Sequence, residues 1–72
     1  MNSIDLHGIK HRDASSMIDS FIRENEDNLP VEIITGNSID MQLILRRVIN
    51  NYSLKMEPTS FVNLGSYVIS NK

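Results

Sequence analysis

The chain has 72 residues, of which 40% are hydrophobic and 22% charged, with a formal net charge of -2 and no cysteine. These values favour one globular domain over residues 1–72 and exclude a disulfide framework and a thiolate-rich metal site. They also give no global basic field of the kind that strong DNA binders carry. Because no apolar run approaches the roughly 18 residues of a membrane span and no signal-peptide pattern opens the chain, we expect a cytoplasmic protein.

The first third of the chain predicts a short strand and then a helix. Residues 4–7 alternate apolar and polar side chains, which is typical of a strand with two different faces, and Gly8 ends it. A helix should follow from about Lys10 or His11 to about Glu26, since one helical stripe holds Ala14, Met17, Ile18, Phe21 and Ile22. Residues 27–30 close this helix, because proline disfavours helix in the residue before it.

The middle of the chain repeats this strand–glycine–helix pattern. Residues 31–35 are rich in β-branched side chains and predict a largely buried strand that ends at Gly36. Asn37 and Ser38 are both good N-cap residues for a second helix. The apolar stripe of that helix is the most regular in the chain and consists of Met41, Ile44, Leu45, Val48, Ile49 and Tyr52.

The last third predicts two further strands. Residues 54–57 alternate as a strand that Pro58 interrupts, and Phe61-Val62 is expected to resume it. Residues 63–65 form a turn, and residues 66–70 form the final strand. The element order β-α-β-α-β-β predicts an α+β fold, a two-layer sandwich with a four-stranded mixed sheet and both helices on one face. The first two strands should be parallel, joined by a right-handed crossover.

Two glycine-broken strand ends should then lie together at one edge of the sheet, where open α/β sheets bind ligands. Asp5 and His7 would point to one side of the first strand, and glycines allow a phosphate to approach main-chain N–H groups. Histidine is also the residue type that titrates nearest neutrality, so it suits proton transfer. A structural alternative stands beside this, in which Asp5 and His7 form a polar clasp that fixes the turn.

Cations at the predicted start of the first helix point to an anionic partner. Lys10, His11 and Arg12 stand at the N-terminus of the first helix, where positive charge opposes the macrodipole, so their presence indicates a use beyond helix stability. Arg46 and Arg47 lie late in the second helix, where cations favour the dipole. The structural alternative is that these ends are simply solvated.

Three stretches together resemble the small MutS-related (Smr) domain. Residues 4–8, Ile-Asp-Leu-His-Gly, with Ala14 six residues later, look like the opening motif of that family. Residues 35–38, Thr-Gly-Asn-Ser, with Leu45-Arg46, resemble its second motif, and residues 65–69 resemble its closing strand. The resemblance implies a fold similar to the C-terminal domain of a bacterial translation initiation factor. It also implies binding of DNA or RNA, with nicking or endonuclease activity in some members.

Carried over to this chain, the resemblance implies that Asp5 and His7 are the catalytic pair. The phosphate-contacting residues would be Gly8, Lys10, His11, Arg12, Thr35, Gly36, Asn37, Ser38 and Arg46. Gly36-Asn37-Ser38 stands where the family usually has Gly-Lys-Gly, so a lysine and a second glycine are missing.

Three functions remain open at this point. In the first, the domain cleaves nucleic acid, with His7 as general acid or base and Asp5 orienting it or positioning a metal-bound water. In the second, the domain binds DNA or RNA without cleavage, and in the third it is a protein-interaction module. We expect no dedicated metal site, although a transient magnesium or manganese ion at Asp5 would suit cleavage. We expect a monomer, no membrane partner and no small-molecule cofactor.

Overall fold

A computed structural model describes residues 1–62 and 64–72 of the chain. Its elements in chain order are β1 (Ser3–Asp5), α1 (His11–Glu24), the short 3-10 helix η1 (Glu26–Asn28), β2 (Val31–Ile34), α2 (Ile39–Ile49), β3 (Leu54–Pro58) and β4 (Ser66–Asn71). This order confirms the predicted β-α-β-α-β-β succession.

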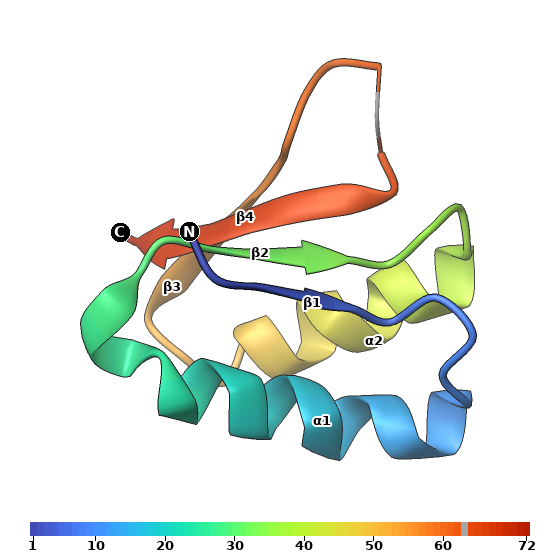
Figure 1. The fold of residues 1–72 in the computed structure, drawn as a ribbon, viewed down its shortest axis with the longest axis horizontal. Helices are drawn as coiled ribbons and strands as arrows, with labels where there is room; N and C mark the ends of the chain where they lie inside the picture. Colours follow the sequence, from blue (N-terminus) through green and yellow to red (C-terminus); the bar gives the residue numbers. More distant parts are fainter. Residues whose placement is uncertain (63) are drawn as a thin grey trace.

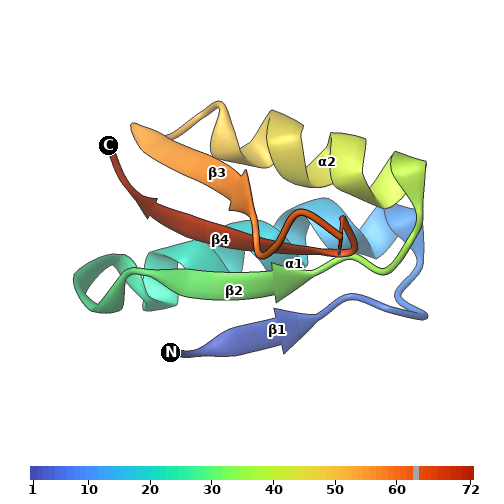
Figure 2. The same ribbon diagram turned by 90° about the horizontal axis from the view of Figure 1, so that it is seen from above.

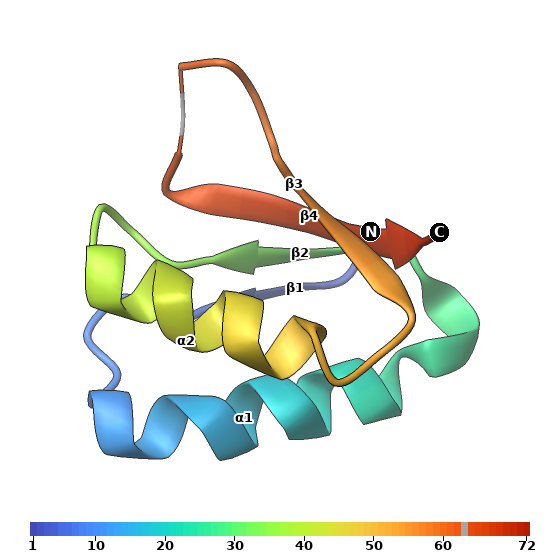
Figure 3. The same cartoon turned by 180° about the vertical axis from the view of Figure 1, so that it is seen from behind.

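The four strands form one mixed sheet in the order β1-β2-β4-β3. β1 runs parallel to β2, whereas β4 lies between β2 and β3 and is antiparallel to both. Both helices pack on the same face of this sheet, and the opposite face carries no helix (Figures 1 and 3). Viewed from above, β1 and β3 are the two edge strands (Figure 2). The predicted two-layer α+β architecture is therefore confirmed.

The core fills the space between the sheet and the helices. The pleat sends alternate side chains of a strand to opposite faces, so Val31 and Ile33 point toward the helices together with their partners Ile69 and Tyr67. The predicted helical stripes supply the other side of this core, where Ala14, Ile18, Ile22, Met41, Leu45, Val48 and Ile49 are buried. Full burial of one such aliphatic side chain contributes about 1.5–3 kcal/mol.

Several predicted boundaries differ from the structure for local reasons. α1 ends at Glu24 instead of Glu26, because the side chain of Asn25 donates to the Phe21 carbonyl at 2.8 Å and closes the helix. Pro58 does not interrupt β3 but ends it, which an edge strand tolerates because its outer side needs no N–H donor. The expected continuation of the strand through Phe61-Val62 is wrong. The N–H of Thr59 donates to the Ser66 carbonyl at 2.9 Å, which turns the chain into a loop. The predicted turn at residues 63–65 includes Asn63, which lies outside the described residues.

A polar cluster ties α1 to the segment after α2. The Tyr52 hydroxyl donates a hydrogen bond to Oδ1 of Asp19, and Nε of Arg23 lies 3.0 Å from Oδ2 of the same carboxylate. The hydrogen bond to Asp19 is the main cause that raises the pKa of Tyr52 above its ordinary value of 10.0. Because this bond needs the protonated phenol, it stabilises the fold only while the phenol keeps its proton.

Replacing Tyr52 by phenylalanine should therefore have a pH-dependent cost. A group whose folded pKa is raised contributes its full stability below the unfolded pKa, near 10.0, and loses it as the pH rises through the folded pKa. We expect Tyr52→Phe to lower the free energy of unfolding by about 1 kcal/mol below pH 10 and by less above it. Urea unfolding of both proteins from neutral to strongly alkaline pH measures this difference. A difference that stays constant across that range would contradict the role of the phenol proton.

Candidate functional site

Two glycine turns lie side by side at the edge of the sheet where the parallel strands β1 and β2 end. The turn after β1 is closed by the Ile9 N–H, which donates to the Leu6 carbonyl at 3.0 Å, and Gly8 adopts a φ of 83° there. The turn after β2 contains Gly36 with a φ of 68°. Because β1 and β2 are parallel, both turns leave the sheet at the same edge (Figures 1 and 2). The predicted juxtaposition of the two strand ends is confirmed.

Contacts between and behind the turns hold them in place. A Cβ added to Gly36 would stand 3.7 Å from Cδ2 of the His7 ring, so the imidazole of one turn lies against the backbone of the other. The N–H groups of Thr35 and Gly36 both donate to the Gly65 carbonyl, at 2.8 and 3.0 Å. The sequence did not indicate Gly65 as part of this edge, because its place depends on the register between β2 and β4.

The two turns enclose a groove with a volume of about 370 Å³. Its apolar floor is formed by Leu6, Ile9 and Met41. Its other lining residues all belong to the predicted phosphate-contacting or catalytic set, namely His7, Gly8, His11, Thr35, Gly36, Asn37 and Ser38. Sequence reasoning missed the floor residues as parts of a site, since their apolar character marks them as core.

Asp5 stabilises the turn that carries His7. It pairs with Ile34, whose neighbour Ile33 points toward the helices, so the side chain of Asp5 faces the open side of the sheet. Its Oδ1 accepts a hydrogen bond of 2.9 Å from the backbone N–H of His7. β1 ends at Asp5 and His7 lies in the turn, so the prediction that both side chains share one face of a strand is wrong. This contact has the geometry of the polar clasp that was the structural alternative.

The predicted cations fall into two groups. Lys10 and Arg12 are exposed at the start of α1, next to the groove-lining His11. Lys10 makes no side-chain capping hydrogen bond there, and Asp13 brings a negative charge into the first turn. Arg46 lies in the last turn of α2, about 12 Å along the helix axis from Ser38. The structure therefore does not bring Arg46 to the groove.

Both helices begin at the groove. His11 is the first residue of α1, and Ser38 is the N-cap of α2, with its Oγ accepting a 3.1 Å hydrogen bond from the Met41 N–H. The capping role expected of either Asn37 or Ser38 thus falls to Ser38. Helix N-termini carry partial positive charge, and two of them converge here, where His7 and His11 also line the groove. Such an arrangement favours an anion.

The donor set of the groove does not fit a resident magnesium or manganese ion. Magnesium prefers carboxylate, carbonyl and water oxygens, and none of the described residues that line the groove is a carboxylate. Across residues 1–62 and 64–72, no cluster of three or more His, Cys, Asp or Glu side chains is arranged to hold a metal ion.

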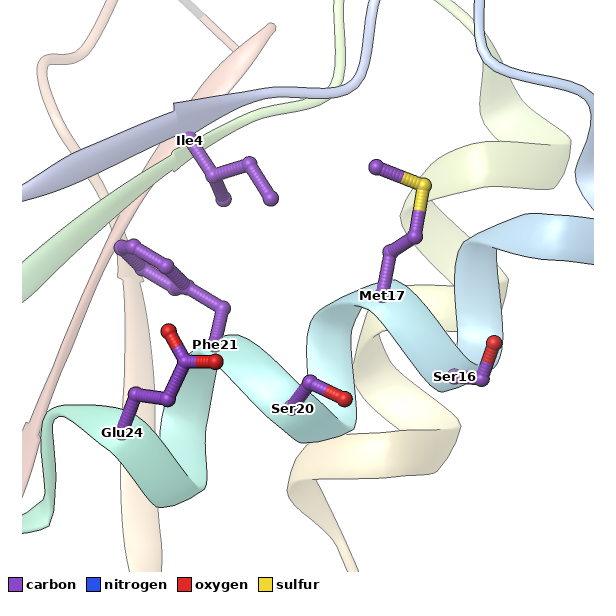
Figure 4. A pocket seen from close by; sticks show the side chains of 6 residues that line it. All are labelled: Ile4, Ser16, Met17, Ser20, Phe21 and Glu24. Atoms are coloured by element: carbon purple, nitrogen blue, oxygen red, sulfur yellow. The ribbon is translucent and has the colours of Figure 1, made fainter.

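A second hollow of about 310 Å³ lies between β1 and α1 (Figure 4). Ile4, Met17 and Phe21 point into it from the two elements, and all three are half-buried. Its polar lining consists of Ser16, Ser20 and Glu24. The carboxylate of Glu24 repels a phosphate, so this hollow is a less suitable anion site than the groove.

Comparison with known proteins gives no further assignment. The chain matches no protein-family model, no curated protein and no solved structure. In the described part of the chain, neither helix combines the length and the apolar character that a membrane crossing requires. A proposal on function therefore starts from the groove itself.

Substitution of Gly8 should cost stability through the backbone alone. A φ of 83° is unfavourable for residues with a Cβ, by about 1–2 kcal/mol, yet an added Cβ would meet no described atom within 4 Å. We expect Gly8→Ala to lower the free energy of unfolding by about that amount. Gly8→Asn should lower it less, because asparagine tolerates positive φ better than alanine. Urea midpoints of the two variants test this, and an equal loss in both would contradict the conformational explanation.

Proposed function

We propose that this chain is a nucleic-acid-binding domain of the small MutS-related type, whose groove holds a phosphate of the DNA or RNA backbone. The observation that carries this proposal is the convergence of two glycine turns and two helix N-termini around one groove. Backbone N–H groups at such positions can bind phosphate oxygens without any side-chain charge. As part of this proposal, the domain is a monomer that acts in the cytoplasm.

The local charge supports the same proposal. Lys10 and Arg12 flank the groove at the start of α1, where they oppose the helix dipole. A bound phosphate would relieve that repulsion, because it places negative charge between the cations and the helix end. Asp13 and Asp40 in the first turns of the two helices reduce the local positive field. These two carboxylates are expected to weaken phosphate binding relative to a groove without them.

Cleavage of the bound strand is a second candidate function. The observation that favours it is that two imidazoles, those of His7 and His11, line the same groove. In this scheme His7 gives or takes a proton at the scissile phosphodiester, as the family resemblance implies. Asp5 acts as a positioning residue, since its carboxylate holds the backbone of the turn that presents His7. The chain's own groups would perform both roles.

The binding proposal predicts a salt dependence tied to two cations. Each lysine or arginine that contacts a phosphate adds about 0.7–0.9 to the slope of log affinity against log salt. We expect Lys10→Gln and Arg12→Gln each to weaken binding and to reduce the slope by about that amount. Lys55→Gln is the matched control, because Lys55 lies on β3 and pairs with Glu57 at 3.3 Å.

Fluorescence anisotropy with labelled DNA and RNA strands measures these slopes. Equal slopes for wild type and for Lys10→Gln and Arg12→Gln would place the contact elsewhere on the surface. No binding by the folded wild type at low salt would overturn the proposed function and favour a protein-interaction module.

The cleavage candidate predicts a graded loss of activity. We expect His7→Ala to slow nicking of plasmid DNA or cleavage of structured RNA by about 10²–10⁴-fold, because it removes the proton-transfer group. Asp5→Asn keeps an acceptor for the His7 N–H and should lose less activity than Asp5→Ala. Assays with and without magnesium or manganese separate metal-dependent from metal-independent activity. If His7→Ala binds and cleaves like the wild type, His7 has no part in catalysis; if neither protein cleaves, the domain only binds.

A further inference from the structure

The loop between β3 and β4 presents a fully exposed aromatic ring. Phe61 is 103% exposed and its neighbour Val62 is 94% exposed. The described residues that follow β3 rise from the sheet on the side away from the helices (Figures 1 and 3). The other aromatic residues are at least half-buried, and Tyr67 is only 5% exposed. An exposed phenylalanine next to an exposed valine contributes little to the core, so both side chains are available to a partner.

This loop starts and ends at the same edge of the sheet as the groove. Its base is closed by Thr59, whose N–H and Oγ1 donate to the carbonyl and the Oγ of Ser66 at 2.9 and 2.8 Å. Gly65, the residue before Ser66, accepts hydrogen bonds from the two N–H groups of the β2–α2 turn. Phe61 follows Thr59 by two residues, so its Cα lies within about 7 Å of the loop base. The loop base therefore adjoins the β2–α2 turn, and a strand several nucleotides long that is bound at the groove can extend to the ring of Phe61.

The charges of the sheet decide which part of a nucleic acid can lie near this loop. The register places Asp5, Glu32 and Glu57 on the open face of the sheet, where Lys55 is the one cation in the described strands. Glu32 also accepts a 2.6 Å hydrogen bond from Ser66 at the loop base. These carboxylates repel phosphates from the open face, whereas the cations are at the start of α1. A strand would thus direct its phosphates toward the helix N-termini and its bases toward the loop.

We infer that Phe61 stacks on an unpaired base, so that the ligand of this domain is single-stranded DNA or RNA. The inference rests on the proposed function, since it needs a phosphate in the groove. Bases of a duplex stack on one another and offer no free face, while a single strand presents a face that an aromatic ring can cover. The groove would hold the backbone, and the ring would select strands with exposed bases.

Substitutions at Phe61 test this inference directly. Stacking of one base on an aromatic side chain corresponds to about a 5- to 150-fold change in affinity. We expect Phe61→Ala to weaken binding of a short oligouridylate or oligothymidylate by at least about fivefold, and to leave binding of the same strand annealed to its complement unchanged. Phe61→Leu is the matched control, because it retains an apolar side chain without an aromatic face. It should lose nearly as much affinity as Phe61→Ala.

A spectroscopic signal separates stacking from an indirect effect. The chain contains no tryptophan, so Phe61→Trp introduces a single indole reporter. We expect its fluorescence to be quenched when the single strand is added and to remain unchanged with the duplex. Lys10→Gln should shift the midpoint of this titration to higher oligonucleotide concentration without removing the quench at saturation.

The outcomes distinguish this inference from the function on which it rests. If Phe61→Ala and Phe61→Leu bind single strands like the wild type while Lys10→Gln is weakened, the groove binds phosphate but Phe61 does not stack. If the loss is equal for single strand and duplex, the selection of unpaired bases is wrong. If the wild type binds neither at low salt and Phe61→Ala removes self-association instead, the loop is a protein contact and both proposals fail.

Discussion

The parallel pairing of β1 with β2 is the constraint on which the site depends. Ile4 pairs with Ile33 and Asp5 with Ile34, and the Leu6 N–H adds a 2.8 Å hydrogen bond to the Ile34 carbonyl beyond the last paired residues. An antiparallel pairing would place the two glycine turns at opposite edges of the sheet. The hydrophobic contacts that fix the register, Ile33 and Leu6 against the helices, thus also fix the distance between His7 and Gly36. The parallel pairing of β1 with β2 therefore determines both the packing of the core and the geometry of the site.

Asp5 combines a structural contact with a role in the proposed function. Its carboxylate accepts the His7 N–H, which ends the strand and begins the turn that carries the imidazole to the groove. The sequence suggested a direct pair of carboxylate and imidazole on one strand face, but in the structure β1 ends at Asp5, and His7 lies in the turn and lines the groove, whereas Asp5 does not. Under the proposed function Asp5 would act through the backbone. Its chemistry then reaches a ligand only through the position of His7.

The sequence predicted the fold well because its signals there are local and repeated. Two apolar stripes define the helices, β-branched residues define β2, and Gly8 and Gly36 mark both turns. The site was predicted in part, since parallel strands bring those turns together whatever their details. Three features depended on longer-range contacts. The face on which Asp5 lies follows from its pairing with Ile34, and the position of the Gly65 carbonyl follows from the register between β2 and β4. The exposure of Phe61 follows from the hydrogen bond of Thr59 that closes the loop. Short alternating patterns contain no information on such partners.

The distribution of charge makes the proposed function compatible with a net charge of -2. Most acidic residues lie on the open face of the sheet or in and after the far part of α1, and only Asp13 and Asp40 are in the first turns of the helices, while Lys10, His11 and Arg12 are consecutive at one helix start. A phosphate responds mainly to the charges within about 8 Å at physiological salt, so the sum over the whole chain does not decide its binding. Under the proposed function, the same separation would give a bound strand a direction across the surface. The acidic face would then contribute to recognition, because it would keep phosphates off the open side of the sheet.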